Sequence, residues 1–209
     1  MTKGELIVAS IKLMFDNGDV DLDPKKISAN YDYQDRTKNI IESINRALYR
    51  IQTANKLPKK FLTINNKTTV SLATRLFSRY NLSALTNNEY YRIVSVAVEN
   101  ENGYSNNVDY RLENDTIVLP KITDGNVNYI VCYMPKIVEL TYQTSDTDAL
   151  SYPNEVLNII PYFVKGDLYE DDDISSARYS RNIFEQYLEA LPTPPETSIK
   201  KDILSVYSW

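Results

Sequence analysis

The chain has 209 residues, of which 43% are hydrophobic, with a net charge of −5, one cysteine and no histidine. This length allows one domain with a sizeable core and an inserted subdomain. No apolar run approaches the roughly 18 residues of a membrane span, and the N-terminal residues lack a signal-peptide pattern. We therefore expect synthesis in the cytoplasm and no membrane partner.

The first 59 residues are predicted to form two helices. Thr2 and Glu5 have the spacing of a capping box, and the apolar residues after them predict a helix over 4–16. A longer repeat at helical spacing predicts a second helix over 34–54. This region, 1–59, is expected to be the first part of a helical body.

Residues 60–150 change to the alternation that is typical of strands. We expect strands over 61–64, 91–98, 116–119 and 127–133, bounded by asparagine-rich and glycine-containing turns. No crossover helix separates them, so the sheet should be antiparallel. Asp124-Gly125 is predicted to close a hairpin between the last two strands, and 100–107 is predicted to be a loop.

Residues 151–191 are predicted to form a helical hairpin with an acidic turn. Pro153 suits the start of the first helix, Asp172 or Asp173 suits the N-cap of the second, and Pro161 should kink the first. The segment holds eight acidic and three basic side chains, which equals the net charge of the whole chain. Its acidic turn consists of Glu170, Asp171, Asp172 and Asp173.

Residues 192–209 begin with a proline-rich stretch, which is typical of an extended chain. The tail then carries more large apolar residues than a solvated terminus needs. We expect it to dock on a partner, either another copy or a different protein, with aromatic side chains as anchors; the alternative is that it packs back on its own domain. The docking residues are expected to be Ile203, Leu204, Val206, Tyr207 and Trp209.

Nothing in the sequence predicts catalysis. Without histidine, the commonest general base and metal ligand is missing, and Cys132 lies in an apolar run that predicts a buried strand residue. Asp19, Asp21 and Asp23 are spaced like a calcium loop, but Pro24 occupies the position of the required glycine. We expect no enzyme, no cofactor and no bound metal.

The terminal hairpin resembles that of bacteriophage head-to-tail connector proteins, the adaptors that form a ring beneath the portal. The matching residues are Pro153, Asn154, Glu155, the acidic break 170–173, and Phe184, Glu185 and Leu188. The order of elements also matches: two N-terminal helices, a β insertion, and a terminal hairpin preceded by a strand ending near Pro135. The resemblance covers most of residues 4–191.

The resemblance implies a structural virion protein, found in the neck, that forms a ring of twelve copies between the portal and the tail. The expected fold is α+β: a helical bundle of two N-terminal helices and a C-terminal hairpin, with an inserted small antiparallel β subdomain and an extended C-terminal tail. Its partners would be further copies, the portal and tail or neck proteins. DNA would pass through without specific binding.

The acidic turn suggests a further role for the hairpin. If residues 170–173 face the channel, their charge should repel DNA and let the genome slide.

Two other functional classes remain open for the protein. One alternative is a nucleic-acid-binding module, although no dense cluster of Lys and Arg is present. A carboxylate-based metal hydrolase is the other, and the lack of histidine disfavours it.

Overall fold

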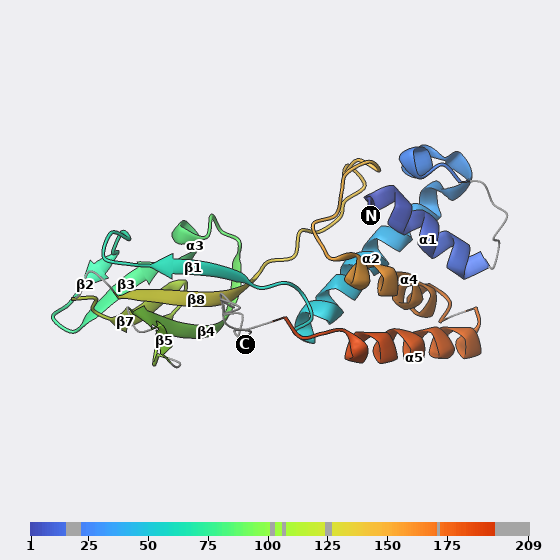
Figure 1. The fold of residues 1–209 in the computed structure, drawn as a ribbon. Helices are drawn as coiled ribbons and strands as arrows, with labels where there is room; N and C mark the ends of the chain where they lie inside the picture. Colours follow the sequence, from blue (N-terminus) through green and yellow to red (C-terminus); the bar gives the residue numbers. More distant parts are fainter. Residues whose placement is uncertain (16–21, 101–102, 106–107, 124–126, 171, 195–209) are drawn as a thin grey trace, which may run out of the picture. The chain divides into compact units, whose positions relative to one another are not determined.

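The computed structural model describes residues 1–15, 22–100, 103–105, 108–123, 127–170 and 172–194. It is an α+β fold with antiparallel sheets, as predicted, and it divides into two compact units (Figure 1). The helical unit comprises Met1–Leu57 and Ile137–Pro194, and the described part of the β unit is Pro58–Lys136. The β unit is thus inserted into the helical unit. The sequence analysis placed the end of the β insertion at residue 150, but the β unit ends at Lys136.

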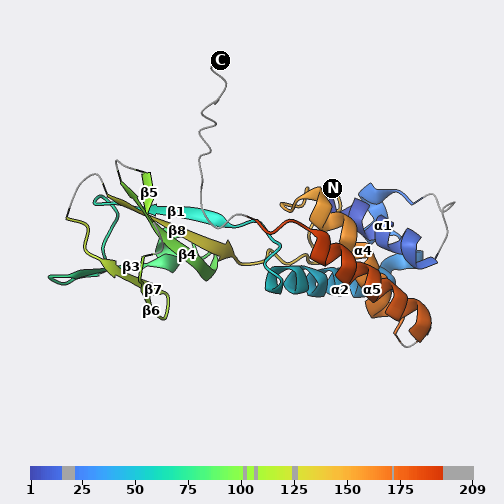
Figure 2. The same cartoon turned by 60° about the horizontal axis from the view of Figure 1, so that its bottom comes forward.

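The helical unit is organised around one helix, α4, which packs against α1, α2 and α5 (Figures 1 and 2). The apolar residues that predicted the helices are buried in this core, among them Leu6, Ile44 and Phe184. Short 3-10 helices, which the sequence did not predict, join α1 to α2. The elements are α1 Lys3–Phe15, η1 Pro24–Ala29, η2 Tyr31–Tyr33, α2 Gln34–Thr53, α4 Asn154–Leu168 and α5 Ile174–Ala190.

Two predicted N-terminal caps are present. The Thr2 hydroxyl accepts a hydrogen bond from the Glu5 backbone N–H (3.2 Å), and the Thr2 N–H donates to the Glu5 carboxylate (2.8 Å). This reciprocal pair is the predicted capping box. At α5, the Asp173 carboxylate accepts from the Ser176 N–H at 3.0 Å. Asp173, rather than Asp172, is therefore the N-cap.

The predicted helical hairpin is formed by α4 and α5. Phe163 and Phe184 meet edge to face, with ring centroids 5.0 Å apart. The helices approach closely at Gly166, where an added Cβ would lie 2.6 Å from Arg181 Cγ. Pro161 is buried inside α4, which continues as one helix from Asn154 to Leu168. The interior proline thus does not divide the helix.

Residues 137–150 return the chain to the helices and are fastened to α1 by a buried ion pair. Lys3 is fully buried, and its ammonium lies 3.2 Å from Asp146 Oδ1. It also donates to the Thr144 carbonyl (2.6 Å) and to Ser28 Oγ (3.2 Å). Ser28, on η1, donates its N–H and its hydroxyl to the same carboxylate, at 2.9 and 2.5 Å. One cluster therefore joins α1, η1 and the returning chain.

Burial alone would raise the pKa of Asp146, but the hydrogen bonds from Ser28 and the charge of Lys3 outweigh it and lower the pKa. The close approach of α1 to Asp146 and Pro24 also requires a glycine at position 4. Gly4 donates its N–H to the Asp146 carbonyl (2.9 Å), and an added Cβ would lie only 1.8 Å from the Pro24 carbonyl oxygen. The start of α1 therefore fits only when residue 4 lacks a side chain.

The described residues of the β unit form two four-stranded antiparallel sheets, in the orders β1-β8-β4-β5 and β2-β3-β7-β6. Side chains from both sheets meet in one core, which includes Ile64, Tyr80, Ile117 and Val131. The elements are β1 Lys60–Ile64, β2 Leu72–Ala73, β3 Phe77–Asn81, α3 Leu82–Leu85, β4 Tyr90–Asn100, β5 Gly103–Ser105, β6 Arg111–Glu113, β7 Thr116–Pro120 and β8 Asn128–Pro135.

Two predictions in this unit are wrong. The last two strands do not form a hairpin, because β7 pairs with β3 and β6 whereas β8 pairs with β1 and β4. β8 is buried along its length, including Cys132 as predicted, and both of its edges are paired. Asp124-Gly125 lies outside the described residues. The expected loop over 100–107 contains β5, which pairs with the end of β4.

Replacement of Gly4 by alanine is expected to destabilise the protein by about 1–3 kcal/mol, the usual cost of overpacking. The added methyl group would overlap the Pro24 carbonyl, so the α1 backbone must shift and strain its bond to Asp146. Urea unfolding followed by circular dichroism measures the change. Lys12→Ala, on the exposed side of α1, is the matched control and should have little effect; equal stability of the two variants would contradict the packing described here.

The buried pair should make stability depend on pH. The Asp146 pKa is lower in the folded protein than in the unfolded chain, so its stabilisation is complete above the unfolded value, about 4, and is lost as the pH falls through the folded value. Lys3→Met should cost about 3–5 kcal/mol at pH 7, because it leaves a buried carboxylate unpaired.

Urea unfolding at pH 7 and pH 3 tests this dependence. Asp146→Asn should lose less stability between the two pH values than the wild type does. Asp148→Asn, an exposed change two residues away, serves as the control and should behave like the wild type. A wild-type pH dependence that persists in Asp146→Asn would show that other carboxylates cause it.

Candidate interaction site

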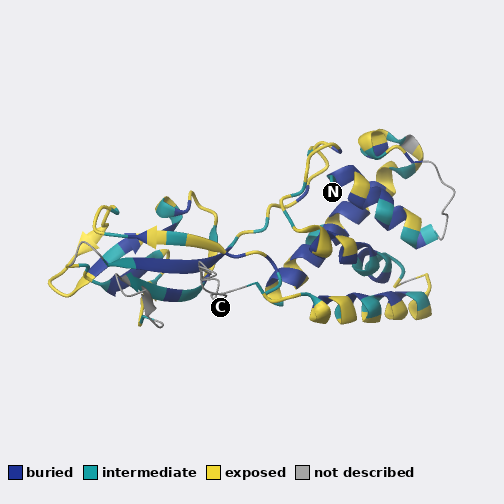
Figure 3. Ribbon diagram, in the orientation of Figure 1, coloured by how far each residue is buried: buried dark blue, intermediate teal, exposed yellow. Residues whose placement is uncertain are grey.

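The β2–β3 hairpin is the most exposed ordered segment of the β unit. Residues 69–77 are all exposed, which Figure 3 shows in yellow at the end of this unit. Its turn is nevertheless well fixed: the Thr74 N–H donates to the Phe77 carbonyl (2.8 Å), and the Thr74 hydroxyl accepts from the Phe77 N–H (3.1 Å). Arg75 and Leu76 therefore stand at the tip of a defined turn.

Large apolar side chains gather on this hairpin. Leu72 is 57% exposed, Leu76 67% and Phe77 46%, and Val70 precedes them at 39%. Single exposed apolar residues are ordinary, but several on one short segment mark an interaction surface. We call this set, with Arg75, the hairpin patch.

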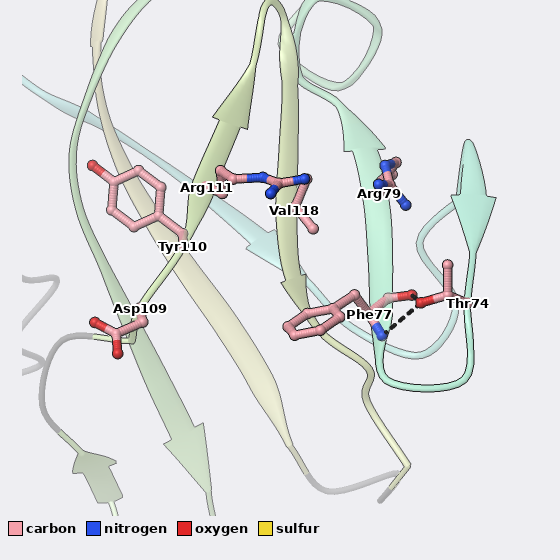
Figure 4. Close-up of a pocket in the computed structure, with 7 residues that line it drawn as sticks. All are labelled: Thr74, Phe77, Arg79, Asp109, Tyr110, Arg111 and Val118. Atoms are coloured by element: carbon pink, nitrogen blue, oxygen red, sulfur yellow. Dashed lines mark hydrogen bonds between the residues drawn. The ribbon is translucent and has the colours of Figure 1, made fainter.

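The sheet face beside the hairpin patch mixes aromatic and arginine side chains. The register places Leu72, Arg79, Val118 and Arg111 in one row across β2, β3, β7 and β6, so they share a face. A hollow of about 350 Å³ opens on this face (Figure 4). It is lined by Thr74, Phe77, Arg79, Asp109, Tyr110, Arg111 and Val118.

The two arginines of this face share one carboxylate. Arg79 Nε donates to Glu113 Oε2 at 3.0 Å, and Arg111 forms an ion pair with the other oxygen of Glu113. These two hydrogen bonds, that from Arg79 first, lower the pKa of Glu113. The arginines are thus held in place by their partner, and this charge network fixes the face of the second sheet.

The surroundings of the hairpin patch are basic. Residues 65–88 contain Lys67, Arg75 and Arg79 and no acidic residue. Lys121, also exposed, donates its N–H to the Leu76 carbonyl at 2.8 Å and so lies beside the tip. The hairpin patch therefore combines apolar side chains with positive charge.

The predicted acidic residues at the α4–α5 turn have different structural roles. Both Glu170 oxygens bind the Arg181 guanidinium, at 3.2 and 2.6 Å. Asp173 caps α5, and Asp172 is exposed. Asp171 lies outside the described residues. The turn is a negatively charged corner of the helical unit. Within the fold, Glu170 is already paired with Arg181 and Asp173 already caps α5.

Exposed apolar residues also lie on α5, directly after this corner. Ile174 is 57% exposed and Tyr179 is 68% exposed, although both belong to a helix whose other side is buried in the core. Ile174 and Tyr179 are five positions apart, so their side chains leave α5 about 140° apart. We call these two residues and Asp172 the corner patch, a set of exposed residues around the start of α5. The predicted docking residues of the tail, Ile203, Leu204, Val206, Tyr207 and Trp209, lie outside the described residues.

Sequence analysis missed the hairpin patch because β2 has only two residues and β3 five. One signal was present: Leu72, Leu76 and Phe77 surround Arg75 in a stretch without acidic residues. Such a mixture on a short segment is hard to bury, because the arginine would need a partner.

Among the residues that the structure describes, no group of three or more His, Cys, Asp or Glu side chains is arranged to hold a metal ion. Within the same ranges, none of the helices combines the length and apolar character needed for a bilayer span. The chain matches no model of a known protein family and no curated protein sequence.

The shared carboxylate on the sheet face gives a direct test of its geometry. The Glu113 pKa should lie below its ordinary value in a carbon-detected NMR titration. Arg79→Gln should raise the Glu113 pKa, and Arg111→Gln should raise this pKa less, because the hydrogen bond from Arg79 contributes more to lowering it. Arg92→Gln is the control on the other sheet and should leave it unchanged. An ordinary Glu113 pKa in the wild type would contradict the paired arrangement.

Proposed function

We propose that this protein is a structural component of a bacteriophage neck. In this proposal its copies form a ring that connects the portal of the capsid to the tail and gives the genome a passage. The observation that carries the proposal is the presence of two unlike exposed patches on one chain, the hairpin patch on the β unit and the corner patch on α5. No catalytic role is assigned to the chain.

Two unlike patches suit a ring for a geometric reason. A ring is built from head-to-tail contacts, in which one surface of each copy fits a different surface of the next, and the rotation closes. A symmetric dimer would instead need one patch that fits itself. The hairpin patch is apolar and basic whereas the corner patch is apolar and acidic, so neither is complementary to itself.

The proposal assigns parts of the ring to the two units. The helices, as a bundle formed by α1, α2 and the α4–α5 hairpin, would be the ring body, and the β unit would make lateral or tail-side contacts. Residues 192–209 would dock on the portal or a neighbouring copy. The resemblance to connector proteins supports a twelve-fold ring that matches the portal, with the protein located in the virion.

The acidic corner has two possible uses in such a ring. It could face the channel and repel DNA, or it could contact the next copy. Ile174 and Tyr179 favour the second use, because a channel wall gains nothing from exposed apolar side chains. In either arrangement the proposal expects DNA to pass without specific binding.

Electron microscopy and native mass spectrometry test the proposal. The purified protein, alone and mixed with the portal protein of the same phage genome, should form closed rings of a single copy number, or complexes with that number on the portal. Bovine serum albumin at the same concentration controls for nonspecific association with the portal. A protein that stays monomeric in both samples would overturn the proposed function.

A further inference from the structure

We infer that residues 203–207 of the tail add as a strand to the open edge of β1 in their own copy. The contact belongs to the free protein, before the tail meets a portal or a neighbouring copy, and it does not require the proposed ring. It places most of the expected docking residues of the tail against the first sheet of the β unit.

The outer edge of β1 is the longest open strand edge in the described part of the β unit. β1 lies at the end of the order β1-β8-β4-β5 (Figure 1), and its five residues pair with β8 without a register shift. The other strands at sheet ends are shorter: β5 and β6 have three residues each, and β2 has two. A regular edge of five residues presents a row of N–H and C=O groups to which another strand can bind.

The side chains of β1 favour a bound strand over solvent. Proteins often protect an edge with proline or with charged residues. β1 contains no proline, and its one charged residue, Lys60, forms an ion pair with Glu89. Phe61 is 39% exposed, and Leu62 is only half-buried. Because successive side chains point to opposite faces of a sheet, both faces present an apolar side chain at this edge, and a strand that pairs with β1 would cover both.

The tail contains a segment with the matching pattern. Residues 203–207 include no charged residue, no glycine and no proline, and four of the five are large and apolar. Isoleucine, valine and tyrosine, which are three of these four, favour strands. In an extended strand, Leu204 and Val206 lie on one face and Ile203 and Tyr207 on the other. Each face of the added strand would therefore cover one of the two apolar side chains of β1.

The described end of the chain brings this segment within reach of β1. The Lys56 ammonium donates to the Leu191 carbonyl (2.6 Å) and to the Thr193 hydroxyl (3.3 Å). The tail therefore starts beside a residue that precedes β1 by four positions, a distance of at most about 14 Å along the chain. Residues 195–202 span at most about 28 Å when extended, so they are long enough to bring 203–207 alongside β1.

The same copy is the favoured source of the strand because the segment is tethered close to the edge that it would cover. A short tether gives an effective concentration in the millimolar range. A strand from another molecule would also lose translational and rotational freedom on binding. A strand supplied by a second copy is an outcome of the test below.

Hydrogen–deuterium exchange of the full-length protein, read by residue with mass spectrometry, tests the contact. In an antiparallel pair the amides of an edge strand alternate between bonding the neighbour and pointing outward. Leu204→Pro combined with Ser205→Pro should make the outward amides of β1 exchange at least about tenfold faster than in the wild type, because neighbouring prolines remove a donor on either side of the added strand. The amides that bond β8 should not change.

The matched control is Thr197→Pro combined with Ser198→Pro, which places two prolines in the spacer and should leave both sets of amides unchanged. Outward amides that exchange at the same rate in the wild type and the 204/205 variant would overturn the contact. Equally faster exchange of both sets in that variant would overturn it too, because the tail would then support the β unit as a whole and not the edge of β1.

Isotope mixing identifies the source of the strand. Nitrogen-15-labelled chains of the 204/205 variant, whose own segment cannot pair, are incubated with an excess of unlabelled wild-type protein. The outward amides of the labelled chains should remain as fast as in the variant alone. Recovery of their protection would assign the strand to a second copy and overturn the inference, whether or not the protein forms rings.

Discussion

The buried pair of Lys3 and Asp146 is the constraint on which the helical unit depends. The chain leaves this unit after α2, builds the whole β unit, and then returns through residues 137–150, which form no helix or sheet strand. At one end of this segment Leu140 is buried in the core, and its backbone exchanges two hydrogen bonds with Asn45 of α2. At the other end its position is set by a desolvated lysine, two hydrogen bonds from Ser28 and the close approach of Gly4.

A buried ion pair of this kind favours one arrangement over others more than it adds to stability, because desolvation offsets much of the attraction. With Asp146 fixed beside Lys3, the following residues place Leu150 and α4 in a single register against α1 and α2. The position of the corner patch, which follows the C-terminal end of α4, therefore depends on this connection.

The sequence predicted the helices well and the pairing of strands poorly, for a physical reason. Helices such as α1 and α5 are local: their apolar repeat and their caps lie within the same segment, so the N-cap of α5 could be narrowed in advance to Asp172 or Asp173. Which strands pair with one another depends on the packing of the whole core and not on one segment. β8 lies between β1 and β4, which pair with the backbone groups along both of its edges, and the short β2, β3 and β6 carry too few residues to show alternation. The hairpin patch depends on those short strands, and the role of Asp146 depends on residues that are more than a hundred positions away.

The β unit begins and ends on neighbouring strands, because Lys60 of β1 pairs with Tyr133 of β8. A module whose two ends lie side by side can be exchanged without moving the chain that carries it, since the host only has to close a short gap. The helical unit is closed independently by its own ion pair, so it would tolerate such an exchange. A lineage of these proteins could therefore retain one helical frame and acquire new surfaces by replacing the inserted module as a whole.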